Sequence, residues 1–224
     1  MSFGPFYFLL IGPALLLGMW AQFRIKSTYA EAQKMPAPLS GAAAAKHIVE
    51  SAGIHGMRIE QVPGHLSDHY DPREKVLRLS PEVYSSRSLA AVGIAAHEAG
   101  HAIQDARNYA PLTIRNAVVP AAGIGSNIGM LLFIVGLVAS LKSLIWVGIA
   151  LFSAVVFFQL VNLPVEFNAS TRAKAQLVSL GIVPEPQMVY VNRVLNAAAL
   201  TYVAATLQAV LTLLYLVMRG NSRS

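Results

Sequence analysis

The sequence predicts a mainly α-helical membrane protein, with four transmembrane helices and one small polar α+β insert. Of its 224 residues, 55% are hydrophobic and only 12% are charged, whereas soluble domains carry about 25% charged residues. Charged residues are absent from four windows, 3–23, 116–141, 143–165 and 194–218. A helix needs about 20 apolar residues to cross a bilayer. Each window meets that length, so we interpret each as a spanning helix.

These windows divide the chain into six segments. Only Lys142 separates the second and third windows, which therefore predict a tight helical hairpin. The predicted segments are transmembrane helix 1 (1–23), a polar insert (24–115), the transmembrane hairpin of helices 2 and 3 (116–165), a second polar segment (166–193), transmembrane helix 4 (194–218) and a tail (219–224).

The distribution of basic residues predicts the orientation in the membrane. Eleven of the 17 lysines and arginines lie in 24–115, and three more lie in 166–193. Four crossings place both segments on one side, and the positive-inside rule makes that side cytoplasmic. We expect a multi-pass protein of the inner (plasma) membrane, with the lipid bilayer as a partner. Topology accounts for the net charge of +6, so no nucleic-acid partner is expected. The oligomeric state is left open.

The polar insert contains signals for both strands and helices. Three short strand-like runs, 57–62, 65–70 and 75–80, are separated by proline-containing turns. They predict a short antiparallel sheet. Ser88 then stands where the N-cap of a longer helix is expected, from Leu89 to about Arg107.

That predicted helix contains the sequence His97-Glu98-Ala99-Gly100-His101. Residues four apart lie on one helical face, so both imidazoles can bind one metal ion. The HExxH pattern on a helix is typical of zinc peptidases, in which the glutamate is the general base. The sequence therefore predicts one Zn²⁺ per chain, bound by His97 and His101, with Glu98 as the catalytic residue. A pair of surface histidines is the alternative interpretation.

A catalytic zinc site needs a third protein ligand. Glu166 is favoured because it directly follows a predicted span, and two crossings return the chain there to the side that holds the histidines. A carboxylate at a membrane boundary is also costly unless it is paired or bound to a metal. The other candidates on the same side are His47, His55, His65, His69, Asp68, Asp71 and Asp105.

Several sequence strings carry a resemblance to a known family. They are the run Leu66 to Pro72, the run Val76 to Ser80, the run Ser88 to Ala91 leading into HEAGHAIQ at 97–104, and Leu163 to Phe167. With them, the chain resembles the YugP-type neutral zinc metallopeptidases, a family of bacterial membrane proteins. The resemblance implies a zincin-like insert and zinc-dependent peptide hydrolysis within the membrane.

A more distant similarity is to the HtpX-type and Ste-type membrane gluzincins. These also place spanning helices between HExxH and a glutamate ligand, in a segment that reads Glu-Phe-x-Ala-Asp. The matching run here is Glu166-Phe167-Asn168-Ala169-Ser170. Ser170 replaces the aspartate that braces a ligand histidine in those families. Asn168 or Ser170 is therefore expected to take that role as a neutral acceptor.

Two further roles can be assigned by analogy with zincins, which bind substrate as an added strand at a sheet edge. The strand Lys75, Val76, Leu77, Arg78 and Leu79 is the candidate edge, because it precedes the site helix. A plain structural hairpin is the alternative. Arg172, or else Tyr84, is the candidate donor to the oxyanion. Arg172 can instead serve only to pair with lipid headgroups.

Taken together, these features predict a membrane-embedded zinc metallopeptidase of the gluzincin type. Its expected partner is a polypeptide substrate, a membrane or unfolded protein that is cleaved at the cytoplasmic face. The alternative is a non-enzymatic zinc-binding membrane scaffold or adaptor. Glu98 argues against a scaffold, because only hydrolysis needs that carboxylate.

Overall fold

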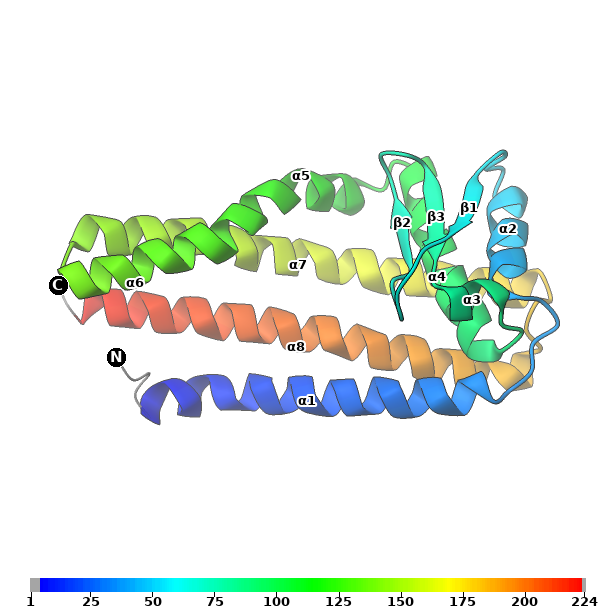
Figure 1. Cartoon of the computed structure of the whole chain (residues 1–224), viewed down its shortest axis with the longest axis horizontal. Helices are drawn as coiled ribbons and strands as arrows, with labels where there is room; N and C mark the ends of the chain where they lie inside the picture. Colours follow the sequence, from blue (N-terminus) through cyan, green and yellow to red (C-terminus); the bar gives the residue numbers. More distant parts are fainter. Residues whose placement is uncertain (1–4, 223–224) are drawn as a thin grey trace. The chain divides into compact units, whose positions relative to one another are not determined.

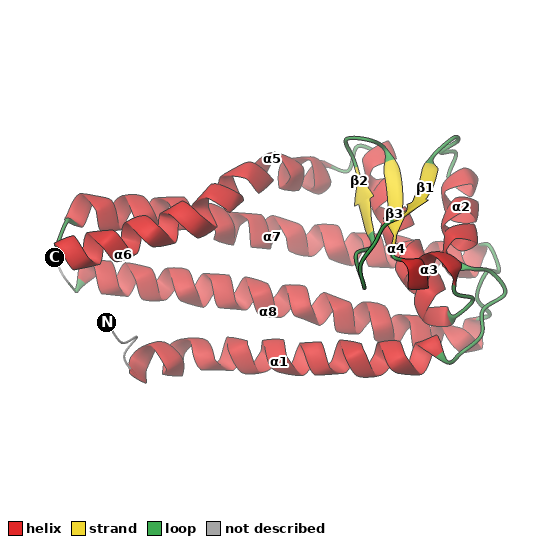
Figure 2. Cartoon of the chain, viewed as in Figure 1, coloured by secondary structure: helices red, strands yellow, loops and turns green. Residues whose placement is uncertain are grey.

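The computed structural model describes residues 5–222, which form a mainly helical chain with one small sheet (Figures 1 and 2). The elements in chain order are α1 (Pro5–Gln33), α2 (Gly41–Ser51), β1 (Arg58–Gln61), β2 (His69–Asp71), β3 (Val76–Leu79), α3 (Pro81–Ser85), α4 (Leu89–Ala106), α5 (Ala110–Ile124), the π-helical turn η1 (Gly125–Gly129), α6 (Met130–Ala139), α7 (Lys142–Ser179), the 3₁₀ turn η2 (Glu185–Gln187) and α8 (Met188–Asn221).

The chain is organised as two compact units. Among the described residues, the apolar unit consists of 5–21, 111–164 and 200–222, and the polar unit consists of 22–110 and 165–199. Each unit has its own core of buried apolar side chains.

Within residues 5–222, four helical segments are long and apolar enough to cross a membrane, which agrees with the predicted number of spans. They are Tyr7–Gln33, Ala110–Ala139, Lys142–Ser179 and Glu185–Asn221. The helices are longer than the charge-free windows. In particular, α7 continues through Pro164 to Ser179, because Ala173 and Leu177 at its far end are buried in the core of the polar unit.

Glycines in the apolar unit allow α6 and α7 to pack against each other at backbone distance. A Cβ added at Gly148 would lie 2.6 Å from the Phe133 nitrogen, and one added at Gly136 would lie 2.7 Å from the Ile145 nitrogen. The connection is equally tight, since Ser140 has a left-handed backbone with φ of 57°. The predicted hairpin of helices 2 and 3 is therefore a closely packed pair.

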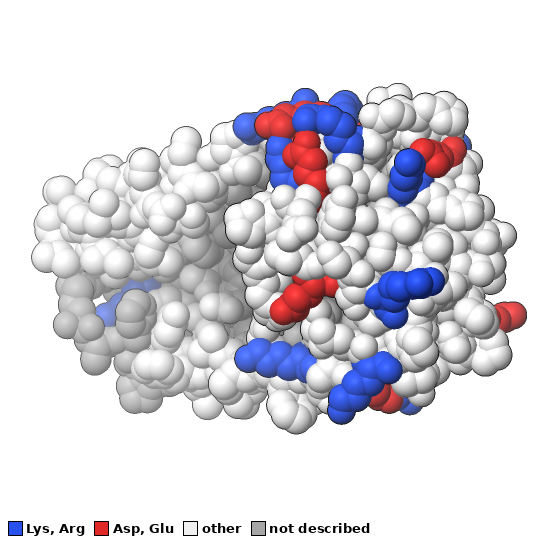
Figure 3. Space-filling model, turned by 45° about the vertical axis from the view of Figure 1, so that its right-hand side comes forward, with Lys and Arg blue, Asp and Glu red and all other residues white. Residues whose placement is uncertain are grey.

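Large apolar side chains are exposed on the apolar unit, as expected for a surface in contact with lipid. Leu9 is 75% exposed, Leu16 is 64% exposed and Val138 is 63% exposed. On the face drawn in Figure 3, charged side chains gather over one part of the surface, and a broad area is almost without them.

Helix α4 forms the centre of the polar unit. Most of its residues are buried, and they pack in one core with α2, with β3 and with the polar ends of α7 and α8. Two predicted features of this helix are confirmed: it begins at Leu89, and the Ser88 hydroxyl caps it by accepting a hydrogen bond of 3.2 Å from the Ala91 N–H.

The sheet of the polar unit is mixed, so the prediction of an antiparallel sheet is wrong. Its strand order is β1-β3-β2, with β3 antiparallel to β2 but parallel to β1. The segment between β1 and β2 does not close a hairpin. Instead, the Asp68 carboxylate accepts a hydrogen bond of 2.8 Å from the Ser80 N–H, which holds the start of β2 beside the end of β3.

This strand order also overturns the expectation that Lys75, Val76, Leu77, Arg78 and Leu79 form a substrate-binding edge. Strand β3 spans Val76–Leu79 and is the central strand of the sheet. Its two edges are already paired with β1 and β2, so no backbone groups remain along it for an added strand.

Candidate metal centre

Helix α4 brings His97 and His101 together on one face, as their spacing predicts. The two ring centroids lie 4.8 Å apart, with the ring planes at 86° to each other. His97 is half-buried, whereas His101 is only 7% exposed. Two imidazoles thus point into one small volume beside the helix.

Glu166 of α7 completes a cluster with these histidines. Its Oε2 atom lies 3.2 Å from Nε2 of His97 and 3.6 Å from Nε2 of His101. One ligand atom from each of the three residues lies within 4.8 Å of the others. Glu166 is only 4% exposed. The close approach of α7 to α4 depends on Gly100, which lies against the backbone of Ala169.

The outer nitrogen of each histidine has its own hydrogen-bond partner. Nδ1 of His97 lies 3.1 Å from the Ser170 hydroxyl, and Nδ1 of His101 lies 3.0 Å from Oε1 of Gln104. Such contacts fix the ring orientation of histidines that bind metals. Ser170 therefore lies where a neutral partner for a histidine was expected. Asn168 does not, because it reaches His101 only through Gln104.

Burial alone would lower the pKa of His101, since burial disfavours the charged imidazolium. The hydrogen bond to Glu166, the charges of Glu98 and Glu166, and the contact with Gln104 outweigh burial and raise the pKa of His101. The cluster is therefore an anionic environment that attracts positive charge.

Glu98 is next to His97 in the chain but turns toward the sheet. Its Oε2 atom accepts a hydrogen bond of 3.0 Å from the Tyr70 N–H in β2. The Tyr70 hydroxyl donates a second bond of 2.7 Å to Asp105, near the C-terminal end of α4. Burial, together with Asp105, raises the pKa of Tyr70. Strand β2 is thus attached to α4 at two points, Glu98 between the two histidines and Asp105 beyond them.

The two candidate oxyanion donors, Arg172 and Tyr84, make different contacts. Arg172 donates from Nε to Asn168 at 2.7 Å, and its guanidinium carbon lies 5.9 Å from the centre of the Tyr109 ring. Tyr84 packs against the core of the polar unit. Among the described residues, no hydrogen bond joins its hydroxyl to the histidine cluster.

The chemistry of this donor set fits zinc. Zn²⁺ in proteins is bound by histidine nitrogens and carboxylate oxygens, and here two Nε2 atoms and one carboxylate oxygen converge. The Nδ1 atoms are engaged by Ser170 and Gln104, which leaves the Nε2 atoms to face the common centre.

Two residues of this site, Gln104 and Tyr70, were missed by the sequence analysis. Gln104 is fully buried, although it lies on a helix that is otherwise largely apolar. A polar residue three positions after His101, on the same helical face, was the available signal. No local pattern marks Tyr70, because its role depends on how the sheet meets α4.

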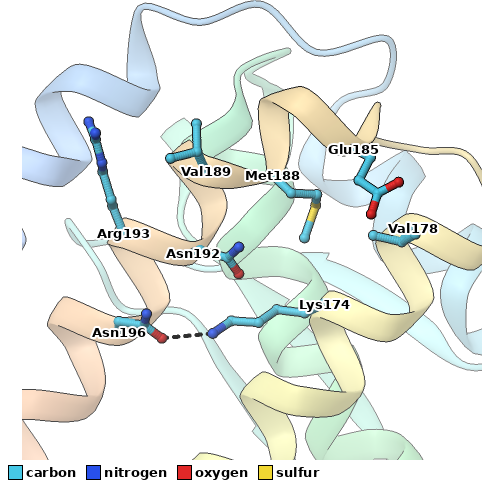
Figure 4. A pocket seen from close by; sticks show the side chains of 8 residues that line it. All are labelled: Lys174, Val178, Glu185, Met188, Val189, Asn192, Arg193 and Asn196. Carbon is cyan, nitrogen blue, oxygen red and sulfur yellow. Dashed lines mark hydrogen bonds between the residues drawn. The ribbon is translucent and has the colours of Figure 1, made fainter.

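The polar unit also contains an open groove of about 490 Å³, shown in Figure 4. There the Lys174 ammonium donates to the Asn196 side chain at 2.7 Å. The groove is lined by Lys174, Val178, Glu185, Met188, Val189, Asn192, Arg193 and Asn196. None of these residues belongs to the histidine cluster, so the groove is separate from it.

Comparison with known proteins agrees with this chemistry. The chain is 46% identical over 215 residues to the "Putative membrane protease YugP" of Bacillus subtilis (strain 168), and the match covers 95% of each protein. No solved structure matches the chain. Residues 7–221 match a protein family described as "Putative neutral zinc metallopeptidase". The chain therefore belongs to this zinc metallopeptidase family.

Proposed function

We propose that this protein is a zinc-dependent endopeptidase of the membrane, which cleaves membrane or unfolded polypeptides at the cytoplasmic face. The observation that carries the proposal is the buried convergence of His97, His101 and Glu166, with Glu98 on the same helix. The family and the membrane relative support peptide hydrolysis. The excess of lysine and arginine in 24–115 supports the cytoplasmic placement.

His97, His101 and Glu166 would hold the zinc ion through Nε2, Nε2 and a carboxylate oxygen. When bound, zinc supplies Lewis-acid chemistry, which polarises a substrate carbonyl and acidifies water. Burial of the three ligands keeps competing water away and strengthens every electrostatic interaction in the site.

Glu98 acts as the general base and then as the general acid. Its carboxylate accepts the proton of the attacking water and returns it to the leaving amine. The Tyr70 N–H holds Oε2 of Glu98, which leaves Oε1 to receive the proton.

Substrate is expected to lie along β2 instead of β3. Strand β2 is an edge strand of the sheet. The Tyr70 N–H bonds to Glu98, so it points away from β3 and toward the site helix. An extended polypeptide added along this edge would therefore pass close to the general base.

The ligand assignment is tested by the metal content of detergent-purified protein. Mass spectrometry should find about one zinc per chain in the wild type and much less in His97→Ala and in Glu166→Gln. Glu50→Gln is the matched control, because Glu50 lies on the exposed side of α2, and it should retain the metal. Full zinc content in Glu166→Gln would remove Glu166 from the ligand set.

The catalytic assignment is tested with Glu98→Gln. This variant should keep its zinc but lose cleavage of an unfolded test protein by about 10²–10⁴-fold, the usual contribution of a general base. Wild-type protein that binds zinc but cleaves no unfolded or membrane polypeptide would instead support the scaffold function.

A further inference from the structure

The fully buried side chain of Gln104 links the two helices that carry the candidate ligands. A buried amide must have hydrogen-bond partners, because leaving it without them costs several kcal/mol. Gln104 has three: His101 Nδ1 at 3.0 Å from its Oε1, and the Val165 carbonyl at 2.8 Å and Asn168 Oδ1 at 3.0 Å from its Nε2. Val165 directly precedes Glu166, so one side chain contacts both sides of the cluster.

Arg172, at the far end of this chain of contacts, determines which atom donates and which accepts in every bond. Arg172 Nε can only donate, because a guanidinium carries N–H donors and no acceptor. The Asn168 atom that receives this bond must therefore be oxygen. That oxygen, like the Val165 carbonyl, can accept only from the Gln104 nitrogen.

The orientation of Gln104 then determines the protonation of His101. With both hydrogens of its Nε2 committed, Gln104 presents Oε1 to the histidine. An oxygen there can only accept, so Nδ1 of His101 must carry a hydrogen. A neutral His101 then has its lone pair on Nε2, the atom that lies 3.6 Å from Glu166 Oε2.

His97 lacks an equivalent constraint. Its Nδ1 atom faces the Ser170 hydroxyl, and a hydroxyl can either donate or accept. The two histidines therefore differ: one has its tautomer imposed by a buried chain of fixed direction, and the other has a partner that adapts.

We propose that Arg172, Asn168 and Gln104 form a hydrogen-bond relay that holds His101 as the Nδ1–H tautomer and so keeps Nε2 free to bind zinc. This inference rests on the proposed zinc site. The three members are positioning residues, because they act on the metal through His101. The contact of Arg172 with the Tyr109 ring helps to hold the charged end of the relay in place.

Zinc affinity, measured by competition with a chromophoric chelator, tests the relay. Gln104→Leu should weaken Zn²⁺ binding by about 10–100-fold, the usual effect of losing an outer partner of a ligand histidine. Asn168→Asp keeps an acceptor for both Arg172 and Gln104 and should bind zinc like the wild type. Asn168→Leu removes that acceptor and should bind more weakly. Gln176→Leu, on α7, is the matched control and should leave the affinity unchanged.

Nitrogen-15 NMR of the zinc-loaded protein gives a second measurement. In the wild type, Nδ1 of His101 should carry a proton that exchanges slowly with solvent, and Gln104→Leu should make that exchange fast. Thermal melting identifies any variant that fails to fold. If Gln104→Leu is such a variant, the Asn168→Asp and Asn168→Leu pair decides the question.

The outcomes separate the relay from the proposed function. Wild-type protein that binds no zinc would overturn the proposed function, and the relay would fall with it. If the wild type binds zinc, equal affinity in Gln104→Leu or in Asn168→Leu would overturn the relay alone. A His101 Nδ1 without an attached proton would also overturn it.

Discussion

Gly100 packs against Ala169 so closely that a Cβ added at position 100 would lie 2.5 Å from the Ala169 carbonyl oxygen. This contact joins the turn of α4 between the two histidines to the turn of α7 that follows Glu166. The separation of the candidate ligands therefore depends on the absence of a side chain at one position of the HExxH sequence.

Gly100→Ala should push α7 away from α4. Overpacking of this kind costs about 1–3 kcal/mol of unfolding free energy, and the displaced Glu166 should also lower the zinc content. Both are measured on purified protein, by thermal unfolding and by mass spectrometry. Gly123→Ala is the control: a Cβ there meets nothing within 4 Å, and the variant should be neutral or slightly stabilised. Equal unfolding free energy and equal zinc content in the two variants would contradict the packing argument.

Ser170→Ala should weaken zinc binding, because Nδ1 of His97 loses its hydroxyl partner. The expected loss of affinity is about 10–100-fold, measured by chelator competition. Ser179→Ala provides a matched substitution on the same helix, where the hydroxyl is exposed and bonds only to the Gln176 carbonyl. Unaltered zinc affinity in Ser170→Ala would show that this hydroxyl does not support the site.

Tyr70→Phe should loosen the attachment of β2 to α4, since the bond from the phenol to Asp105 is lost. A hydrogen bond to a charged group contributes about 1.5–3 kcal/mol, so the unfolding free energy should fall by that order. Cleavage should slow, because the backbone N–H of the same residue holds Glu98.

Tyr84→Phe is the control for Tyr70→Phe, and it also tests a separate assignment. Its stability should stay within about 0.5 kcal/mol of the wild type, as for most substitutions away from buried bonds. A large loss of activity in Tyr84→Phe, with stability intact, would instead identify Tyr84 as the oxyanion donor.

A reporter enzyme that is active only outside the cytoplasm should be active when fused after Arg219. Four crossings and the basic residues of 24–115 predict that Arg219 lies outside. The same reporter fused to a chain that ends at Arg107 should be inactive, since that position lies in the insert that is predicted to be cytoplasmic. The reverse pattern would contradict the predicted orientation.

The parts of the fold that could be predicted from the sequence are those set by local patterns. Charge-free windows revealed the four spans, because the bilayer demands an uninterrupted apolar length. The Ser88 cap and the His97–His101 spacing revealed α4, because both are properties of a single helix. The proximity of Glu166 to the histidines could be argued from topology, since an even number of crossings returns the chain to the same side.

The parts that could not be predicted depend on contacts between distant segments. The sheet is mixed because β1 pairs with β3 in parallel, and no local sequence pattern predicts that pairing. The hydrogen-bond partner of His101 was missed for a similar reason. The spacing of Gln104 from His101 was a local signal, but the Val165 carbonyl and Asn168, which satisfy the buried amide, come from α7 and could not be predicted from that spacing.

The candidate ligands come from two helices that are far apart in the sequence, and this has a consequence for biosynthesis. A ribosome that has completed α4 has made His97 and His101, but the carboxylate that closes the cluster is not yet translated. It is translated only after α6 and the apolar first part of α7. A nascent or truncated chain that ends before Glu166 therefore carries the HExxH sequence without the third candidate ligand, and we expect it to bind zinc more weakly than the full chain.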